Sequence, residues 1–176
     1  MAKGRPVVLA GLDIGTSKTA VVIAAIKSAT VELLGVGESP SIGVQKGIVT
    51  DIDSAAKSIG QALEKAEKMA GLKIDSAYLS HNGASIQVRN CRVEHPAAAH
   101  PVYNGGNNKA PNLSTPTVSG IPEGEKPLHI ISPRVKSCGF GAIPGWDARI
   151  ITARTRDLAN MIQSVRQAGV EAQGII

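Results

Sequence analysis

Aromatic side chains are almost absent from this chain, in which Phe, Trp and Tyr make up 2% of 176 residues. Its core must therefore be built from Val, Ile, Leu and Ala, which suit the closely spaced strands and helices of an α/β sheet. The apolar fraction of 43% is large enough for one ordinary domain or for two small ones.

Cysteine and long apolar runs are also scarce. The two cysteines, Cys91 and Cys138, lack the spacing of a metal site and indicate neither a disulfide scaffold nor zinc binding. No apolar run approaches the roughly 20 residues of a membrane-spanning helix. The N-terminus leads straight into a predicted strand, so we expect a protein that is neither secreted nor membrane-spanning.

Clustered positive charge is the third feature that is missing. The formal net charge is +5, but the Lys and Arg residues are dispersed along the chain. Because aromatic stacking partners are also few, the composition favours a general basic surface over nucleic-acid binding.

The most informative segment that is present is 11–18, which lies between two apolar runs. Its pattern is typical of two strands joined by a phosphate-binding turn, in which Gly15 takes a positive φ. The turn offers backbone and hydroxyl donors and one ammonium group to an anion, whereas Asp13 is placed to hold a hydrated Mg²⁺. An ordinary hairpin turn is the alternative, since turns favour Asp and Gly. The predicted phosphate-binding residues are Gly15, Thr16, Ser17 and Lys18.

Periodicity elsewhere predicts alternating strands and helices. Asp51 or Asp53 is expected to cap a helix over 54–70, and Thr155 a second helix that stops at Gly169. Neither aspartate is expected to be catalytic. The predicted strands after the first hairpin cover residues 31–39, 76–80, 84–88, 127–131, 149–152 and 170–176.

Two further features yield no catalytic prediction. His81 follows a predicted strand without a nucleophile or second ligand nearby, so we expect it to be structural or solvent-exposed. Residues 96–127 are rich in Pro, Gly, Ser and Asn and break every period, which predicts an irregular or disordered segment.

Taken together, these motifs resemble the FtsA family of bacterial cell-division proteins, within the actin, Hsp70 and sugar-kinase superfamily. The similarity is specific in the first half of the chain and weaker in the second half. It rests on residues 11–18, 41–47, 62–71 and 81–83, and then on residues 121–131 and 150–176.

The resemblance implies an α/β, actin-like (ribonuclease H-like) ATPase fold. Residues 1–83 would form the first part of subdomain 1A, which contains the phosphate hairpin. Residues 84–170 would form an inserted α+β subdomain of the 1C type, and residues 171–176 would begin the return to 1A.

The resemblance also implies a function in cell division. FtsA-like proteins bind ATP with Mg²⁺ and self-associate into filaments. They link the FtsZ ring to the cytoplasmic face of the inner membrane and recruit later division proteins. We expect a nucleotide-binding structural protein with at most weak ATPase activity.

The sequence departs from the family pattern in its second half. The family's second phosphate hairpin, its adenosine motif and its amphipathic C-terminal helix have no counterpart here. We therefore expect an incomplete form, either truncated or frame-disturbed, with a natural variant loop as the milder alternative. ATP and Mg²⁺ binding would be weak or lost, and membrane contact only indirect. An actin-like ATPase or kinase fragment, a PilM-like pilus-assembly protein and an Hsp70-like protein remain alternatives.

Overall fold

The structure is a computed structural model that describes residues 6–27, 30–94, 117–134 and 145–176. The chain divides into two compact units. Unit 1 comprises Met1–Ile86 and Arg154–Ile176, and unit 2 comprises Gln87–Ala153. Unit 2 is therefore inserted into unit 1 along the sequence, and each unit is described by itself below.

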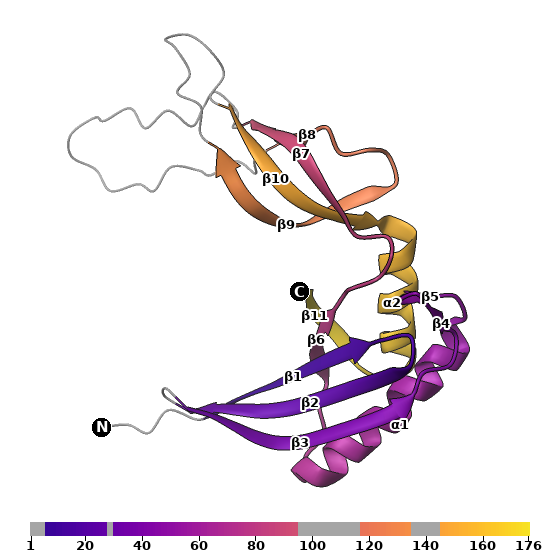
Figure 1. Ribbon diagram of the computed structural model, residues 1–176. Coiled ribbons are helices and arrows are strands. Elements are labelled where there is room, and N and C mark those ends of the chain that lie inside the picture. Colours follow the sequence, from indigo (N-terminus) through magenta and orange to yellow (C-terminus); the bar gives the residue numbers. More distant parts are fainter. Residues whose placement is uncertain (1–5, 28–29, 95–116, 135–144) are drawn as a thin grey trace, which may run out of the picture. The chain divides into compact units, whose positions relative to one another are not determined.

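Unit 1 is built on a five-stranded sheet of order β11-β6-β1-β2-β3 (Figure 1). The first three strands form an antiparallel meander, whereas β6 and β11 run parallel to β1. The strands are β1 (Val7–Ile14), β2 (Lys18–Lys27), β3 (Thr30–Pro40), β6 (Ser76–Ser80) and β11 (Glu171–Ile175), with a small hairpin of β4 (Val44–Gln45) and β5 (Ile48–Val49).

Two helices cover one face of this sheet. Helix α1 (Ile52–Ala70) packs on β2 and β3, and α2 (Thr155–Gln167) packs on α1, β5 and β11. Helix α1 comes so close to β3 that a Cβ on Gly37 would lie 1.9 Å from the Ala62 carbonyl oxygen. Glycine is therefore needed at this position, because any side chain would push the helix off the strand.

The ends of α1 follow from local hydrogen bonds. The Asp51 carboxylate accepts hydrogen bonds from the backbone N–H groups of Asp53 and Ser54, at 3.1 and 3.3 Å. Gly71 ends the helix with a φ of 70°. The predicted helix is thus confirmed, with Asp51 as its cap. Asp53 is not the cap, and its side chain accepts a hydrogen bond from Gln167 at 2.8 Å.

Unit 2 contains a four-stranded sheet of order β8-β7-β10-β9. Its buried core consists of Cys91, Val93, Ala148 and Ile150. The buried thiol of Cys91 is free, while Cys138 lies outside the described residues. The strands are β7 (Gln87–Glu94), β8 (Thr117–Ser119), β9 (Glu125–Arg134) and β10 (Gly145–Arg154).

Several boundaries differ from the sequence predictions. The units divide at residues 86 and 154 rather than at 83 and 170, because α2 packs on α1 and so groups with unit 1. Thr155 is the first residue of α2 and Arg154 its cap, without a side-chain hydrogen bond. The segment predicted to be irregular, 96–127, contains β8 and the start of β9. The residues of β8 have only a weak local preference for a strand, and they become extended because they pair with β7. Its residues 96–116 lie outside the described part.

No helix in the described ranges combines the length and apolar content that crossing a membrane requires.

Candidate functional site

The turn between β1 and β2 has the predicted position but not the predicted backbone. The Gly15 N–H donates to the Lys18 carbonyl oxygen at 3.0 Å and closes the turn. Gly15 does not adopt a positive φ, so that prediction was wrong. A Cβ at this position would lie 3.0 Å from the Lys18 oxygen. The close approach of the two backbone segments therefore explains why residue 15 is a glycine.

Asp13 is held in place where β1 ends. The register aligns Asp13 with Ala20 of β2 and with Ser80 of β6, so these side chains share one face of the sheet. The Ser80 hydroxyl donates a hydrogen bond to Asp13 Oδ1. Since β1 and β6 are parallel, their carboxyl ends meet at this edge, where ligands bind in open α/β sheets.

The hydroxyl of Thr16 connects the turn to a neighbouring loop. Its Oγ1 accepts a hydrogen bond from the Gly47 N–H at 2.9 Å, and the Ser41 N–H donates to the Ser17 carbonyl oxygen at 3.1 Å. A hydroxyl that accepts a bond keeps its own proton. Thr16 is therefore positioned by the loop yet still able to donate to an anion, and both Thr16 and Ser17 are exposed.

The ammonium group of Lys18 is turned toward β3. Its Nζ lies 2.6 Å from Glu38 Oε1, in an ion pair whose two side chains are both exposed. The hydrogen bond and the charge of Glu38 raise the pKa of Lys18, with a smaller contribution from Asp13. Lys18 stays charged but is engaged by Glu38, so the structure does not bring it together with the donors of the turn.

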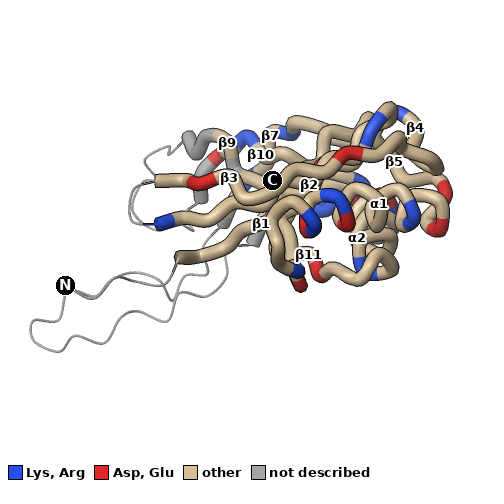
Figure 2. Tube along the Cα trace, turned by 90° about the horizontal axis from the view of Figure 1, so that it is seen from below, with Lys and Arg blue, Asp and Glu red and all other residues tan. Residues whose placement is uncertain are grey.

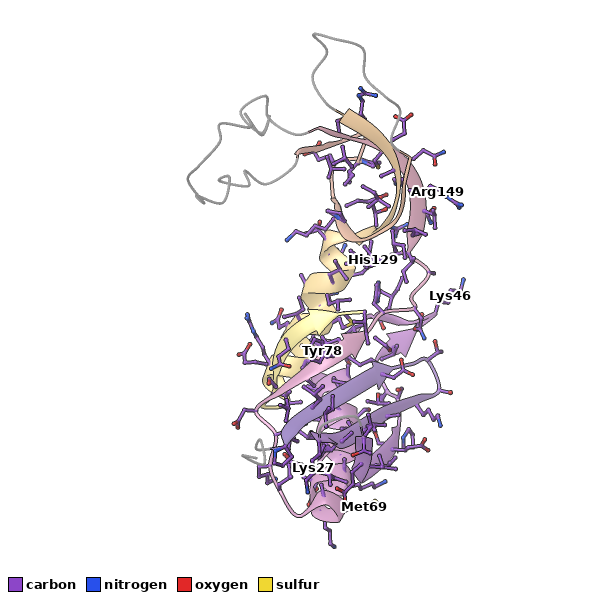
Figure 3. The ribbon with its side chains drawn as sticks, turned by 90° about the vertical axis from the view of Figure 1, so that its left-hand side faces the viewer. Lys27, Lys46, Met69, Tyr78, His129 and Arg149 are labelled. Carbon is purple, nitrogen blue, oxygen red and sulfur yellow. The ribbon has the colours of Figure 1, made fainter. Side chains whose placement is uncertain are left out.

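Two loops that the sequence analysis did not connect support the hairpin. The Ala84 N–H donates to the Lys46 carbonyl oxygen at 3.0 Å, which holds loop 81–84 against loop 43–47. Lys46, in the turn between β4 and β5, has a left-handed φ of 50° and an exposed side chain, which projects outward in Figure 3. Gly47 and Gly83 were the sequence signal for the contact between these loops. Their role becomes visible only in the structure, where the two backbones touch.

His81 is buried behind these loops. Its Nε2 lies 3.3 Å from the Ser85 hydroxyl, and 8% of the residue is exposed. Burial lowers the pKa of His81, and the charge of Asp157 partly opposes this shift. Of the two predicted alternatives, solvent exposure is therefore wrong, and a structural role stays a prediction.

Among the described residues, no group of three or more His, Cys, Asp or Glu side chains could hold an ion. A single carboxylate such as Asp13 suits a Mg²⁺ that keeps most of its waters and takes its other ligands from phosphates.

Comparison with known proteins shows where the chain resembles others. No family model matches it. The cell division protein FtsA of Pseudomonas aeruginosa is 39% identical over 83 residues, which are 47% of this chain and 20% of that protein. FtsA of Borreliella burgdorferi is 28% identical over 181 aligned residues, which cover 96% of this chain and 43% of that protein.

The chain is similar to FtsA. The resemblance inferred from the motifs is thus confirmed, and the chain spans 20% and 43% of the lengths of these two FtsA relatives. A chain of a PilM–PilN type IV pilus biogenesis complex superposes with a TM-score of 0.62 at 14% identity, covering 95% of this chain and 46% of that one. The predicted actin-like α/β fold is confirmed.

Proposed function

We propose that this chain is an FtsA-like scaffold of bacterial cell division whose β1–β2 hairpin contacts the phosphates of Mg·ATP. The observation that carries the proposal is the fixed position of Asp13, held by Ser80 at the carboxyl ends of two parallel strands. Next to it, the turn offers the exposed hydroxyls and the N–H groups of Thr16 and Ser17, while the Gly15 N–H closes the turn. Asp13 would bind Mg²⁺ through water, and the turn would bind phosphate oxygens.

Lys18 completes the proposed site once it leaves Glu38. Exposed ion pairs contribute little net free energy, and a triphosphate carries more charge than one carboxylate. The ammonium group would therefore move to the phosphate at small cost. After this exchange, Gly15, Thr16, Ser17 and Lys18 would bind the phosphate as a set.

A structural role is favoured over an enzymatic one. Phosphoryl transfer needs a base or a water-positioning group beside the phosphate. Asp51 caps α1 and Asp53 binds Gln167, so both carboxylates already have other roles. We propose at most weak ATPase activity.

The proposed partners follow the FtsA relatives. The chain would act in the cytoplasm at the division site, on the inner membrane face, together with FtsZ and later division proteins. It would self-associate into filaments and reach the membrane through its partners. A PilM-like role in pilus assembly is the second candidate, supported by the structural likeness over 95% of the chain; the higher sequence identity favours FtsA.

A titration followed by NMR tests nucleotide binding. Each hydrogen bond to a charged phosphate is worth about 1.5–3 kcal/mol, and the described site offers one hairpin, so we expect a Kd of roughly 0.1–1 mM. Adding Mg·ATP to ¹⁵N-labelled protein should shift the amides of residues 15–17 before others. Asp13→Asn should weaken binding, whereas Asp75→Asn, an exposed aspartate before β6, should not. Absence of shifts at 5 mM nucleotide, or equal binding by both variants, would contradict the proposal.

A further inference from the structure

Three buried polar side chains of unit 1 form a cluster behind the loops that support the β1–β2 hairpin. His81, Ser85 and Asp157 are 8%, 2% and 8% exposed. The Nε2 atom of His81 lies 3.3 Å from the Ser85 hydroxyl, and Asp157 lies close enough for its charge to act on the imidazole. We call these three residues the buried cluster. All of them are enclosed in the chain as it stands, so the cluster does not depend on a further covering element.

One atom of the buried cluster lacks a partner. Asp157 Oδ2 is out of reach of solvent and accepts no hydrogen bond from any described residue. Leaving a buried carboxylate oxygen unsatisfied costs free energy, and folded proteins pair nearly all such groups. A donor that a neighbouring side chain offers only in its second protonation state would explain the unpaired oxygen.

The buried cluster lies where the chain leaves unit 1 and returns to it. The last residues of unit 1 before the insertion, 81–86, form the outgoing connection, and the first residues after it, 154–160, form the returning connection. Two members of the buried cluster, His81 and Ser85, belong to the outgoing connection, whereas Asp157 belongs to the returning one. The cluster therefore brings together groups from both connections.

Both connections are also fixed to the small β4–β5 hairpin. In the outgoing connection, the Ala84 N–H donates to the Lys46 carbonyl oxygen at 3.0 Å. In the returning connection, Asn160 Nδ2 donates to the Val49 carbonyl oxygen at 3.2 Å. Helix α2 packs on β5, and the two lie side by side in Figure 1 and in Figure 2. The β4–β5 hairpin therefore holds the two connections close enough for one side chain to join them.

Asp157 is the charged group that acts on His81. Burial lowers the pKa of His81, and the charge of Asp157 partly opposes the shift. The strand β11 presents only a neutral group, since the Ile176 carbonyl oxygen accepts the His81 N–H at 3.1 Å. Asp13 of β1 is bound by Ser80. The other charged residues on the segments around His81 are exposed, and they are Lys46, Arg154, Arg156 and Glu171.

We propose that the buried cluster is a proton-operated link between the outgoing and the returning connection. In a neutral imidazole one ring nitrogen donates, whereas an imidazolium donates from both. A proton taken up from solvent by His81 gives the ring its second N–H. The ring then donates to the Ser85 hydroxyl oxygen and to Asp157 Oδ2 together. One side chain thereby ties the two connections to each other, and the joint to unit 2 stiffens as the pH falls.

A pH titration by NMR tests this link in the whole chain, with ¹³C-labelled histidine, a ¹⁵N-labelled backbone and no nucleotide. We expect the amides of residues 85–86 and 155–158 to shift with the same midpoint as the His81 ring. In Asp157→Asn, His81 should bind its proton at least about threefold more weakly, because the opposite charge is lost. Asp75→Asn removes an exposed carboxylate before β6 and is the matched control, which should leave the His81 titration unchanged.

Asp157→Ser is a second variant in case Asp157→Asn does not fold, which circular dichroism shows. Equal proton affinity of His81 in the parent and in the Asp157 variant would overturn the link. So would a His81 titration that the amides of residues 155–158 do not follow, or a His81 that takes up no proton before unit 1 unfolds. Because nucleotide is absent from this experiment, its failure is independent of the Mg·ATP titration.

Discussion

Gly47 and Gly83 lie in direct backbone contact: a Cβ on Gly47 would come 2.8 Å from the Gly83 Cα, and one on Gly83 would come 2.7 Å from the Gly47 carbonyl oxygen. The contact fixes the loop whose Gly47 N–H binds Thr16. Two residues without side chains thus set the position of a proposed phosphate ligand.

We expect Gly83→Ala to lower the free energy of unfolding by about 1–3 kcal/mol, the usual cost of inserting a methyl group where none fits. Urea unfolding followed at 222 nm measures it, because both described helices lie in unit 1. Gly60→Ala is the control, since its Cβ would meet no atom within 4 Å in α1. Gly60→Ala should raise the free energy of unfolding by about 0.5–1 kcal/mol. Equal destabilisation by both would contradict the contact.

Glu38→Gln should strengthen Mg·ATP binding, by roughly twofold to fivefold, because it frees the Lys18 ammonium from an exposed competing carboxylate. The gain should disappear in about 1 M salt, where the Debye length is near 3 Å. Glu32→Gln, also exposed on β3, is the matched control. Weaker binding by Glu38→Gln would mean that Glu38 positions Lys18 for the phosphate instead of competing for it.

Unit 1 should lose stability in mild acid through His81. Burial lowers the folded-state pKa of His81, so the unfolded chain binds the proton first as the pH falls below about 6.5. The contribution of His81 to the free energy of unfolding is complete above that pH. It declines as the pH falls from there to the lowered folded-state pKa.

Unfolding measured between pH 7.5 and 5 in the parent and in His81→Gln isolates this dependence. The variant should show the shallower decline. His129→Gln, an exposed histidine of β9, should follow the parent. Parallel curves for the parent and His81→Gln would refute a neutral, buried His81.

Asp51→Ala should lower the Tm by more than Asp53→Ala, because only Asp51 accepts the free N–H groups that begin α1. The side-chain and backbone hydrogen bonds from Ser54 lower the pKa of Asp51. Its contribution is therefore present above the ordinary aspartate pKa and is lost as the pH falls through the lowered value. The difference in Tm between the two variants should shrink toward pH 2. A difference independent of pH would contradict an ionised cap.

Local signals were sufficient for much of unit 1. The alternation in β1 and β2, the apolar stripe of α1 and the stop at Gly71 each depend on residues close in sequence. The position of the β1–β2 hairpin was predicted correctly for the same reason. The backbone conformation of its turn was not predicted correctly. Residue 15 is glycine because the chain comes close to the Lys18 carbonyl oxygen there, and not because its φ is positive.

Partners that are distant in sequence were not predictable from local patterns. Ser80 meets Asp13, Glu38 meets Lys18, and Gly47 meets Gly83 only because the sheet order brings the strands together. The strand β8 was missed because residues 117–119 have no periodicity of their own and become extended by pairing with β7. The assignment of α2 to unit 1 likewise depends on its packing against α1.

The insertion of unit 2 between β6 and α2 has a consequence for how the chain is made on the ribosome. The meander and α1 are complete early in synthesis and depend on contacts close in sequence. The pairing of β11 with β6, in contrast, must wait until all of unit 2 has been translated. The entropic cost of closing a loop grows only slowly with its length, so the delay comes from the order of synthesis. A growing chain therefore holds an unpaired β6 edge for that whole interval, which is when a chaperone would most reduce misassembly.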